Sequence, residues 1–550
     1  MSPLNMQDPG VVQAQALAEQ VAALKLPNNL ADFCAQQAKK LGDQVALNFF
    51  EYEVTVSYKQ LHQRSNCAAN SLQNMGVKKG DHVALMMHNH PDYLVSWFAI
   101  AKLGAVVVPV NFAYTSNELQ YVLSDSDSKF LLIGEAYLTT FSAMETRPEP
   151  LIDSHLVVFT DDNRTSQHLM SFGQLIQDGQ PDFICDYNVA LNDLMQIQYT
   201  SGTTGFPKGC MQTHEYWLFA ANSAAAIVSG QGIKNVLSIF PMFYMEPQVQ
   251  LLVTLVVGGT AFVATKPSAR KFMDWVRTYN IHYCTFHEVV MKGMEVSSTD
   301  ADNSLVYVSA FQYKGEAHKQ LEQRFNLIGR DAFAMTETGS GTFMPIAATH
   351  MVGLGSCGLP APMRHFKLLN DDGGEVAQGD SGVLWIKGRG LFLGYYNKPE
   401  ANAKEFNGDW FCTGDIARQD ENGYFYIVGR TKEMIKRSGE NIAAREVEAV
   451  LRELPQVMEA AVLPVPDEHR REEVKAYLIL RDDLSQEDCP PEKIIEHCAQ
   501  RLAAFKLPRY IAYVNDFPRT PSNKVAKQRM IDSSDDLRLD AFDQLDQVWR

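Results

Sequence analysis

The segment with the strongest chemical signal is YTSGTTGFPKG, at 199–209. Its glycines allow close backbone approach, its hydroxyls and successive amides can donate to phosphate oxygens, and Lys208 adds a positive charge. The spacing differs from GxxxxGK[ST], which excludes a Walker-type loop. A polar surface turn is the alternative, but the order of hydroxyls, glycines and a closing Lys-Gly favours a phosphate loop. We expect its contacts to come from Thr200, Ser201, Gly202, Thr203, Thr204 and Lys208.

The elements around this loop alternate between strand and helix patterns. The loop follows a strand pattern at 194–198 and precedes a helical stretch that begins near Thr213. Strands separated by crossover helices indicate parallel sheets covered on both faces. We therefore expect an α/β fold with a large N-terminal domain of parallel-rich sheets covered by helices. The other strand patterns lie at 82–86, 105–110, 129–133, 155–159, 235–240, 260–264 and 282–286.

The pattern changes near residue 430 to a shorter α+β arrangement. We place a domain boundary there, giving a large N-terminal domain over 1–429 and a small C-terminal domain over 430–550. The small domain is expected to end in a helical tail after Lys524. Its predicted elements are a helix at 445–454, strands at 457–463 and 473–480, and a helix at 491–503.

The composition excludes several classes of protein. The chain has 550 residues, of which 46% are apolar and 21% charged, values that exclude a mainly disordered chain. Its 49 Lys and Arg against 65 Asp and Glu give a net charge of −16, which would repel nucleic acid. No apolar run is long enough for an integral membrane segment, and the N-terminus does not resemble a secretory signal. The 9 cysteines form no CxxC pair, so we expect reduced thiols and a cytoplasmic enzyme.

The segment at 199–209 closely resembles the signature loop of the adenylate-forming enzymes, which include acyl-CoA synthetases, luciferase-like enzymes and the adenylation domains of peptide synthetases. Other segments resemble further motifs of that family, and they occur in the family's order. A single motif could arise by chance, whereas an ordered set across the chain indicates membership. These segments are AMTET at 334–338, DWFCTGD at 409–415, YFYIVGR at 424–430, IKRSGEN at 435–441 and TPSNKV at 520–525.

The resemblance implies a reaction in which a carboxylate attacks the α-phosphate of ATP, giving an acyl-adenylate and pyrophosphate. Lys524 would reach the carboxylate and α-phosphate from the small domain, with Lys208 also in the catalytic group. Thr336 would bind the α-phosphate, and Glu337 would hold Mg²⁺ as the metal ligand. Outside this context, Lys524 would be a solvated lysine and the Thr-Glu pair a helix cap.

The resemblance also implies a nucleotide site. Asp415 would accept hydrogen bonds from the ribose hydroxyls, Arg430 would contact the ribose, and Lys436 would supply a positive contact. Phe333 replaces the usual Tyr, so adenine stacking is retained without a phenol hydroxyl. The adjacent AMP-binding residues would be Ala334, in place of the usual Gly, and Met335. Asn523 likewise replaces the usual Gly before Lys524, and Asn tolerates left-handed backbone angles.

For the second half-reaction, the resemblance implies that the small domain rotates about a hinge at Lys432. This rotation would withdraw Lys524 and bring Ser438 and Gly439 to the thiol of coenzyme A. An ordinary linker role for Lys432 is the alternative of equal weight.

The segment that corresponds to the small residues beside the acyl tunnel of fatty-acid members is bulky in this chain. Phe311 and Gln312 would shorten the pocket, while Tyr244 stands where many members have His. Glu246 and Phe286 would line the next walls. Aromatic rings and a carboxylate suit a short cationic or zwitterionic acid. The alternative, of at least equal weight, is that the aromatics are core residues and the glutamates face solvent.

The leading hypothesis is an AMP-forming acyl-CoA synthetase, an ATP-dependent acid–thiol ligase that uses ATP, Mg²⁺ and coenzyme A. Its motif layout resembles that of carnitine/crotonobetaine-type CoA ligases, and the acid would be short, polar or zwitterionic. One alternative is a stand-alone adenylation enzyme that loads a carrier protein. Another is a noncatalytic nucleotide-binding relative. The identity of the acid and the oligomeric state stay open, with a homodimer as one candidate.

Overall fold

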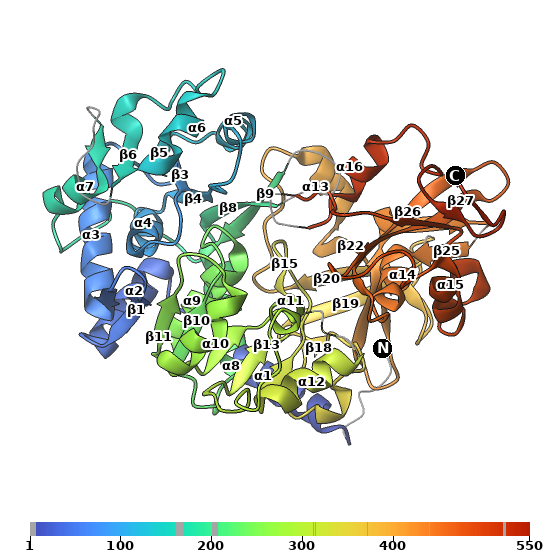
Figure 1. Ribbon diagram of the computed structural model, residues 1–550. Helices are drawn as coiled ribbons and strands as arrows, with labels where there is room; N and C mark the ends of the chain where they lie inside the picture. The colour runs from blue at the N-terminus through green and yellow to red at the C-terminus, as the bar shows by residue number, and fades with distance from the viewer. Residues whose placement is uncertain are drawn as a thin grey trace.

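The computed structural model describes residues 7–160, 169–200, 207–311, 313, 315–370, 372–438, 440–520 and 524–550 (Figure 1). Of the predicted site residues, Ser201, Gly202, Thr203, Thr204, Gln312 and Gly439 lie outside these ranges.

The first sheet of the N-terminal part carries the stems of the predicted phosphate loop. Its order is β7-β6-β5-β3-β4-β8-β9, and only the β8–β9 pair is antiparallel. All residues of β3 and β5 are buried, as expected for parallel strands covered on both faces. The strands are β3 (His82–Met86), β4 (Val106–Pro109), β5 (Phe130–Gly134), β6 (Leu156–Phe159), β7 (Met170–Ser171), β8 (Leu194–Thr200) and β9 (Lys208–Thr213).

The second sheet has the order β14-β13-β12-β10-β11-β1-β2 and is parallel except at its β1–β2 edge. Both parallel-rich sheets match the predicted α/β class. The strands are β1 (Val45–Phe49), β2 (Val54–Ser57), β10 (Asn235–Ser238), β11 (Thr260–Val263), β12 (Tyr283–Thr285), β13 (Tyr307–Ser309) and β14 (Ile328–Arg330).

One hydrophobic core joins the two sheets through the helices between them. It contains inward side chains of both sheets together with Trp97 and Trp217, whose ring centroids are 5.7 Å apart. The Trp97 indole also donates a 2.7 Å hydrogen bond to Gln196 on β8, so the core fixes the strand that leads into the predicted phosphate loop. The helices of this core are α2 (Leu30–Leu41), α3 (Tyr58–Asn74), α4 (Pro91–Lys102), α8 (His214–Ile227) and α9 (Met245–Val257).

The remaining helices of the N-terminal part cover the outer faces and edges. They are α1 (Pro9–Ala22), α5 (Ser116–Asp125), α6 (Leu138–Ser142), α7 (Phe172–Asp178), α10 (Ala269–Thr278), α11 (Glu288–Lys292), α12 (Gly315–Phe325) and α13 (Pro399–Glu405). None of the helices in the described ranges is long and apolar enough to cross a membrane.

A third, antiparallel sheet follows the two parallel ones. It comprises β19 (Arg364–Leu369), β20 (Ser381–Gly388), β21 (Phe406–Asn407), β22 (Trp410–Gln419) and β23 (Phe425–Arg430). Two small hairpins precede it, β15 (Ala334–Met335) with β16 (Gly339–Ser340), and β17 (Thr342–Phe343) with β18 (Leu359–Pro360).

The C-terminal part is a smaller unit at the right of Figure 1, with a hydrophobic core of its own. A short turn of 3₁₀-helix, η4 (Thr431–Glu433), connects it to β23. Its sheet has the order β25-β24-β27-β28-β29-β30, with β26 paired to β27. The strands are β24 (Met434–Arg437), β25 (Glu440–Ala443), β26 (Val457–Asp467), β27 (Arg471–Leu480), β28 (Tyr510–Tyr513), β29 (Phe542–Asp543) and β30 (Val548–Trp549), and the helices are α14 (Ala444–Leu451), α15 (Pro491–Ala499) and α16 (Lys527–Asp532).

The expected helical tail after Lys524 requires correction. Only α16 is helical there, and the chain then returns to the sheet as β29 and β30. The physical reason is that Phe542 is buried and pairs with Ile511 of β28, so sheet pairing overrides the local helical pattern.

Candidate functional site

A buried carboxylate lies where the antiparallel sheet meets the C-terminal domain. Asp415 on β22 stands directly opposite Arg430 on β23, and Oδ1 of Asp415 accepts a 2.9 Å hydrogen bond from Nε of Arg430. The Asp415 side chain is only 1% exposed. Burial raises the pKa of Asp415 above its ordinary value, against the opposing attraction of Arg430.

The other oxygen of this carboxylate is a vacant acceptor. Among the described residues, Oδ2 of Asp415 is buried and has no hydrogen-bond partner. A buried acceptor without a partner is costly, and two hydroxyl donors of a sugar would satisfy it. The chemistry of this oxygen therefore fits the ribose of a nucleotide.

The Thr336–Glu337 turn, between β15 and β16, is fixed by its backbone. The carbonyl of Thr336 accepts hydrogen bonds of 3.0 Å from both Gln212 and Tyr216, and the carbonyl of Glu337 accepts one of 3.0 Å from the amide of Phe392. These bonds leave the two side chains available for other contacts.

The Glu337 side chain is buried beside a tyrosine. Oε1 of Glu337 accepts a 2.9 Å hydrogen bond from the hydroxyl of Tyr395. Burial raises the pKa of Glu337, although the Tyr395 hydrogen bond and the charges of Arg430 and Lys208 favour its ionised form. The described residues contain no cluster of three or more His, Cys, Asp or Glu side chains that could hold a metal ion. A single carboxylate suits a cation that takes its other ligands from substrate phosphates and water, as Mg²⁺ does.

Lys208 lies at the start of β9, at the second stem of the predicted phosphate loop. Its ammonium group is 2.9 Å from Oε1 of Glu405 and 3.7 Å from the centroid of the Tyr395 ring. Thr200, at the first stem, donates a weak 3.4 Å hydrogen bond to the Lys208 carbonyl. Lys208 and Glu337 thus share Tyr395, so the loop stem and the Thr-Glu turn belong to one group.

Lys524 comes to the same junction from the C-terminal domain. Its charge is favoured by Glu337 and Asp415 and disfavoured by Arg430 and Arg445. The side chain keeps solvent-exposed surface, yet surrounding protein displaces much of its water and is the main cause of a lowered pKa. The structure therefore places Lys524 within the electrostatic reach of Glu337 and Asp415, residues that are distant from it in the sequence.

Other predicted nucleotide residues flank this group. Phe333 and Met335 are half-buried and Ala334 is exposed. Phe333 is held by a 2.8 Å hydrogen bond from its amide to the hydroxyl of Thr342. Its ring packs at the edge of a core cluster that includes Phe366 and Phe425.

Two further predicted residues, Lys436 of the nucleotide site and Ser438 of the thiol-transfer site, lie on a different part of the C-terminal domain. Lys436 is exposed on β24, and Ser438 follows at the turn with a left-handed φ of 51°. No hydrogen bond or ion pair among the described residues joins either one to Asp415, Glu337 or Lys524. The backbone of Lys432 lies in η4, between the two domains.

The predicted acyl pocket contains a half-buried carboxylate at the start of α9. Glu246 hydrogen-bonds Thr285 and is close enough to His287 for their charges to interact. Burial raises the pKa of Glu246, with Thr285 and His287 acting in the opposite direction. A second polar pair lies near Glu246, in which the Tyr283 hydroxyl is 3.1 Å from Oγ of Ser309.

Phe286 lies away from this polar wall. Its ring is fully buried between Phe272 and Phe325, with centroid distances of 4.7 and 5.1 Å. Successive residues of an extended chain point to opposite sides, so Thr285 and His287 face Glu246 while Phe286 faces the core. Of these three residues, Thr285 and His287 are therefore the ones on the side of Glu246.

The two other described residues of the predicted acyl pocket are half-buried. Tyr244 is the residue that precedes the first turn of α9, and its ring centroid lies 4.2 Å from that of Phe243. Phe311 lies just beyond the end of β13.

Sequence reasoning missed the residues that connect the predicted ones. Tyr395 and Glu405 hold Lys208 and Glu337, Gln212 and Tyr216 fix the Thr336 carbonyl, and Arg445 interacts with both Asp415 and Lys524. Gln212 and Tyr216 follow the loop closely in the sequence, which was the available signal. Glu405 and Arg445 carry no such signal, because only the fold brings them to the site.

Two family models match the chain. The one described as AMP-binding enzyme covers residues 34–396, and the one described as AMP-binding enzyme C-terminal domain covers 446–524. Among curated relatives, a crotonobetaine/carnitine–CoA ligase of Proteus mirabilis is 30% identical over 487 residues, covering 86% of this chain and 92% of that protein. The long-chain-fatty-acid–CoA ligase FadD13 of Mycobacterium tuberculosis is 29% identical over 479 residues, with the same shares of 86% and 92%.

Solved structures share the fold. The anthranilate CoA ligase AuaEII in complex with anthranoyl-AMP superposes with a TM-score of 0.83 at 22% identity, covering 93% of this chain and 98% of that one. ATP-bound MatB from Rhodopseudomonas palustris superposes with a TM-score of 0.81 at 25% identity, covering 92% and 99%.

The vacant oxygen of Asp415 leads to a binding prediction. We expect Asp415→Asn to weaken AMP binding at least about tenfold, because a neutral amide is a poorer acceptor for two hydroxyl donors than a carboxylate. Calorimetry with AMP and with dideoxy-AMP, which lacks both ribose hydroxyls, measures this. Dideoxy-AMP should bind the variant and the wild type about equally.

The matched control is Asp409→Asn, which changes an exposed carboxylate in the same segment and should leave AMP binding unchanged. Equal losses for AMP and dideoxy-AMP in Asp415→Asn would show that Asp415 does not contact the ribose.

Proposed function

We propose that the substrate of this protein is a compact carboxylic acid with a cationic or polar end. The premise is that the chain belongs to the AMP-binding enzyme family and is an AMP-forming acyl-CoA synthetase. The observation that carries this proposal is the half-buried Glu246 carboxylate, which hydrogen-bonds Thr285 and lies near His287. A carboxylate in that position favours a positively charged group on the substrate by Coulomb attraction, and neighbouring aromatic faces such as Tyr244 add cation–π attraction. The relatives named for crotonobetaine and carnitine are consistent with this substrate class.

In the first half-reaction, the substrate carboxylate attacks the α-phosphorus of ATP and pyrophosphate leaves. Negative charge develops on the phosphoryl oxygens, so positioned cations and donors lower the barrier. We assign this role to the Lys524 ammonium, the Thr336 hydroxyl and Lys208. Lys208 would have to share its charge between phosphate and Glu405, its ion-pair partner.

The adenosine moiety would be held on the antiparallel sheet. The proposed contacts are ribose hydroxyls donating to Asp415, a positive contact from Arg430, and stacking of adenine on Phe333. The desolvated carboxylate of Glu337 would hold Mg²⁺ together with phosphate oxygens, and the bound ion would supply positive charge that polarises the phosphoryl group.

The second half-reaction needs a different arrangement of the site, because within the described ranges no hydrogen bond or ion pair joins Ser438 to Asp415, Glu337 or Lys524. We propose that the 430–550 domain rotates about Lys432, so that Lys524 leaves the site and the turn at Ser438 approaches the thiol of coenzyme A. The connection between β23 and β24 is a suitable position for such a hinge, because it consists of the short η4 alone.

Lys524→Ala should lower the rate of acyl-adenylate formation by at least about a hundredfold, the scale of losing one placed donor. Thioester formation from supplied acyl-adenylate should change little, because the rotation moves Lys524 away. Pyrophosphate release and thioester formation, measured separately, distinguish the two half-reactions. Lys493→Ala, at an exposed position of α15, serves as the control.

The lowered pKa of Lys524 adds a pH test of the same assignment. Lysine is active only when protonated, so adenylation should fall as pH rises through a pKa below the ordinary 10.5. Arginine stays protonated throughout that range, so Lys524→Arg should abolish this alkaline decline whatever its maximal rate. An unchanged alkaline decline, or equal loss of both half-reactions in Lys524→Ala, would contradict the assigned role.

The pocket proposal predicts selectivity between two acids of the same shape. The pair is γ-trimethylammoniobutanoate and its carbon isostere, in which a tert-butyl group replaces the trimethylammonium group. We expect the wild type to have the higher kcat/KM for the cationic acid. Glu246→Gln should lower that value at least about tenfold and leave the neutral isostere within about twofold, because only the charged acid loses a Coulomb partner.

Glu288→Gln is the matched control, since Glu288 pairs with Lys292 on the surface of α11. A wild type that prefers long neutral acids, or a Glu246→Gln variant that affects both acids alike, would contradict charge recognition by Glu246.

A further inference from the structure

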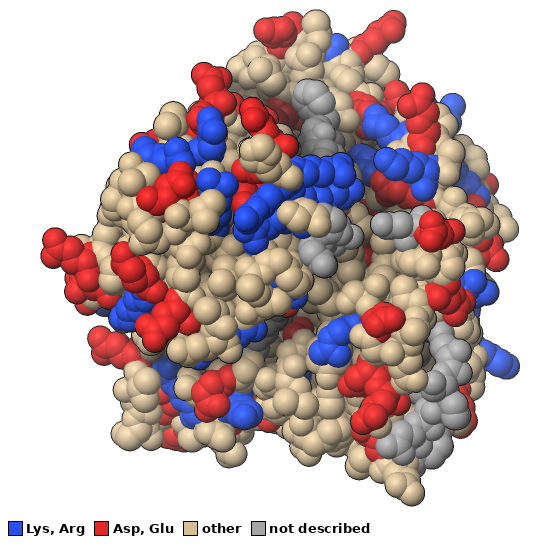
Figure 2. Space-filling model, turned by 90° about the vertical axis from the view of Figure 1, so that its right-hand side faces the viewer, with Lys and Arg blue, Asp and Glu red and all other residues tan. Residues whose placement is uncertain are grey.

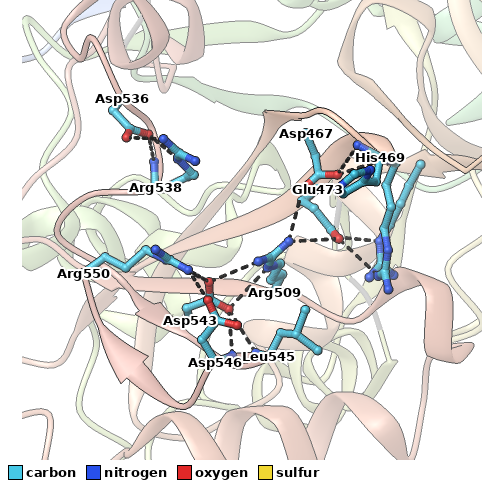
Figure 3. Close-up of polar contacts among 12 residues, drawn as sticks. Asp467, His469, Glu473, Arg509, Asp536, Arg538, Asp543, Leu545, Asp546 and Arg550 are labelled. Carbon is cyan, nitrogen blue, oxygen red and sulfur yellow. Dashed lines mark hydrogen bonds and ion pairs between the residues drawn. The ribbon is translucent and has the colours of Figure 1, made fainter.

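A buried ionic cluster lies inside the C-terminal domain (Figure 3). At its centre the Glu473 side chain is 0% exposed, and its carboxylate pairs with Arg437 at 2.6 Å and with Arg470 at 3.1 Å. A third guanidinium group, that of Arg509, lies 3.6 Å from Oε1 of Glu473. A carboxylate so deeply buried is stable only because these cations surround it.

The cluster continues from Arg509 to the end of the chain. Arg509 pairs with Asp467 at 3.1 Å and with Asp543 at 3.3 Å, and Arg550 pairs with Asp543 at 2.6 Å. Burial opposes ionisation of Asp543, but the hydrogen bonds from Arg509 and Arg550 outweigh it and lower its pKa. The chain end, with β29 and β30, is therefore tied to the same ionic group as Glu473.

Glu473 is connected through two arginines to the start of the turn that carries Ser438. Arg437, the last residue of β24, binds Glu473 directly. Arg470 also binds Glu473, and its carbonyl accepts a 2.9 Å hydrogen bond from the amide of Ser438. In the sheet, Arg437 stands opposite Arg471. The ion pairs of Glu473 with Arg437 and Arg470 therefore lie beside the turn, whose first residue, Ser438, has a left-handed φ.

The loop that carries Lys524 has anchors of its own. Arg519 pairs with Glu459 at 2.6 Å, and the amide of Thr520 donates a 2.8 Å hydrogen bond to the Lys524 carbonyl. On the other side of Lys524, Lys527 pairs with Glu448 at 2.7 Å. The carboxylates that pair with Arg519 and Lys527 are not members of the Glu473 cluster.

The face of the molecule formed by this domain carries many charged side chains. In Figure 2, which views the right-hand side of Figure 1, Lys and Arg gather across the upper half with Asp and Glu around them. Exposed ion pairs contribute little to the stability of the fold. The fully buried carboxylates of Glu473 and Asp543 instead fix the positions of the arginines that pair with them.

We propose that Glu473 is a positioning residue for the thiol-transfer half-reaction, in which it fixes the turn at Ser438 through Arg437 and Arg470, and that the chain end supports it through Asp543 and Arg509. The proposal rests on the proposed function, because it takes the Ser438 turn as the part of the domain that meets the thiol. Its distinctive consequence is that the two half-reactions depend on separate ionic groups of one small domain.

Measuring both half-reactions in a matched pair of variants provides the test. Glu473→Gln should slow thioester formation from supplied acyl-adenylate at least about tenfold, since small displacements of positioned groups are costly, and change adenylate formation by less than about threefold. Glu459→Gln should show the reverse pattern, because it loosens only the Lys524 loop. The supplied probe is γ-trimethylammoniobutanoyl-adenylate or, where the wild type prefers the neutral acid, the adenylate of its carbon isostere.

Asp543→Asn and Asp536→Asn complete the set. Asp543→Asn leaves Glu473 in place and should lower thioester formation selectively but less strongly, so it replaces Glu473→Gln if that variant does not fold. Asp536 forms an exposed pair with Arg538 in the same chain end, and Asp536→Asn should match the wild type in both half-reactions.

The outcomes separate this inference from the function on which it rests. Equal losses in both half-reactions, or none, for Glu473→Gln or Asp543→Asn would overturn the positioning role while leaving an active wild type and the ligase assignment intact. A wild type that forms the adenylate but transfers it to no thiol would overturn the proposed second half-reaction, and this inference with it.

Discussion

The carboxylate of Asp415 is the constraint on which the site depends. It is almost completely buried, and within the part of the chain that the structure describes only one of its oxygens has a hydrogen-bond donor, Arg430. The pairing of β22 with β23 places Arg430 opposite Asp415, so that one carboxylate oxygen has a donor. Lys524 and Arg445 of the C-terminal domain lie close enough to Asp415 for their charges to interact with it. A desolvated acceptor with a vacant oxygen beside two cations is the arrangement that a ribose and its phosphates would complete.

The same principle organises the rest of the molecule, since its buried carboxylates are each held by a small, specific set of partners. Glu337 has Tyr395, Glu246 has Thr285 and His287, and Glu473 has its arginines. Glu246 lies in the first turn of α9, Glu337 between β15 and β16, and Glu473 near the start of β27, so their hydrogen bonds and ion pairs fix a turn or the end of an element. Side chains at the ends of strands and helices can contact a ligand while the rigid sheets hold them in position.

Much of this could be predicted from the sequence, because it resides in local patterns. Buried runs such as 82–86 predict parallel strands, and the ordered motifs place Asp415, Glu337 and Lys524 without a structure. The partners could not be predicted, because Glu405 and Arg445 reach the site only through long-range packing. Phe286 shows a second limit of prediction from sequence. Its side chain points into the core because side chains alternate along the strand, and which side it takes depends on where β12 ends.

The products of the reaction distinguish an AMP-forming acyl-CoA synthetase from other ATP-dependent enzymes. Purified protein would be incubated with ATP, coenzyme A and each of a panel of carboxylic acids, and the nucleotides and thioesters quantified by chromatography. We expect AMP, pyrophosphate and acyl-CoA in equal amounts, formed only when a compact, polar or cationic acid is present. Formation of ADP and phosphate, or AMP release that does not depend on any acid, would contradict this expectation.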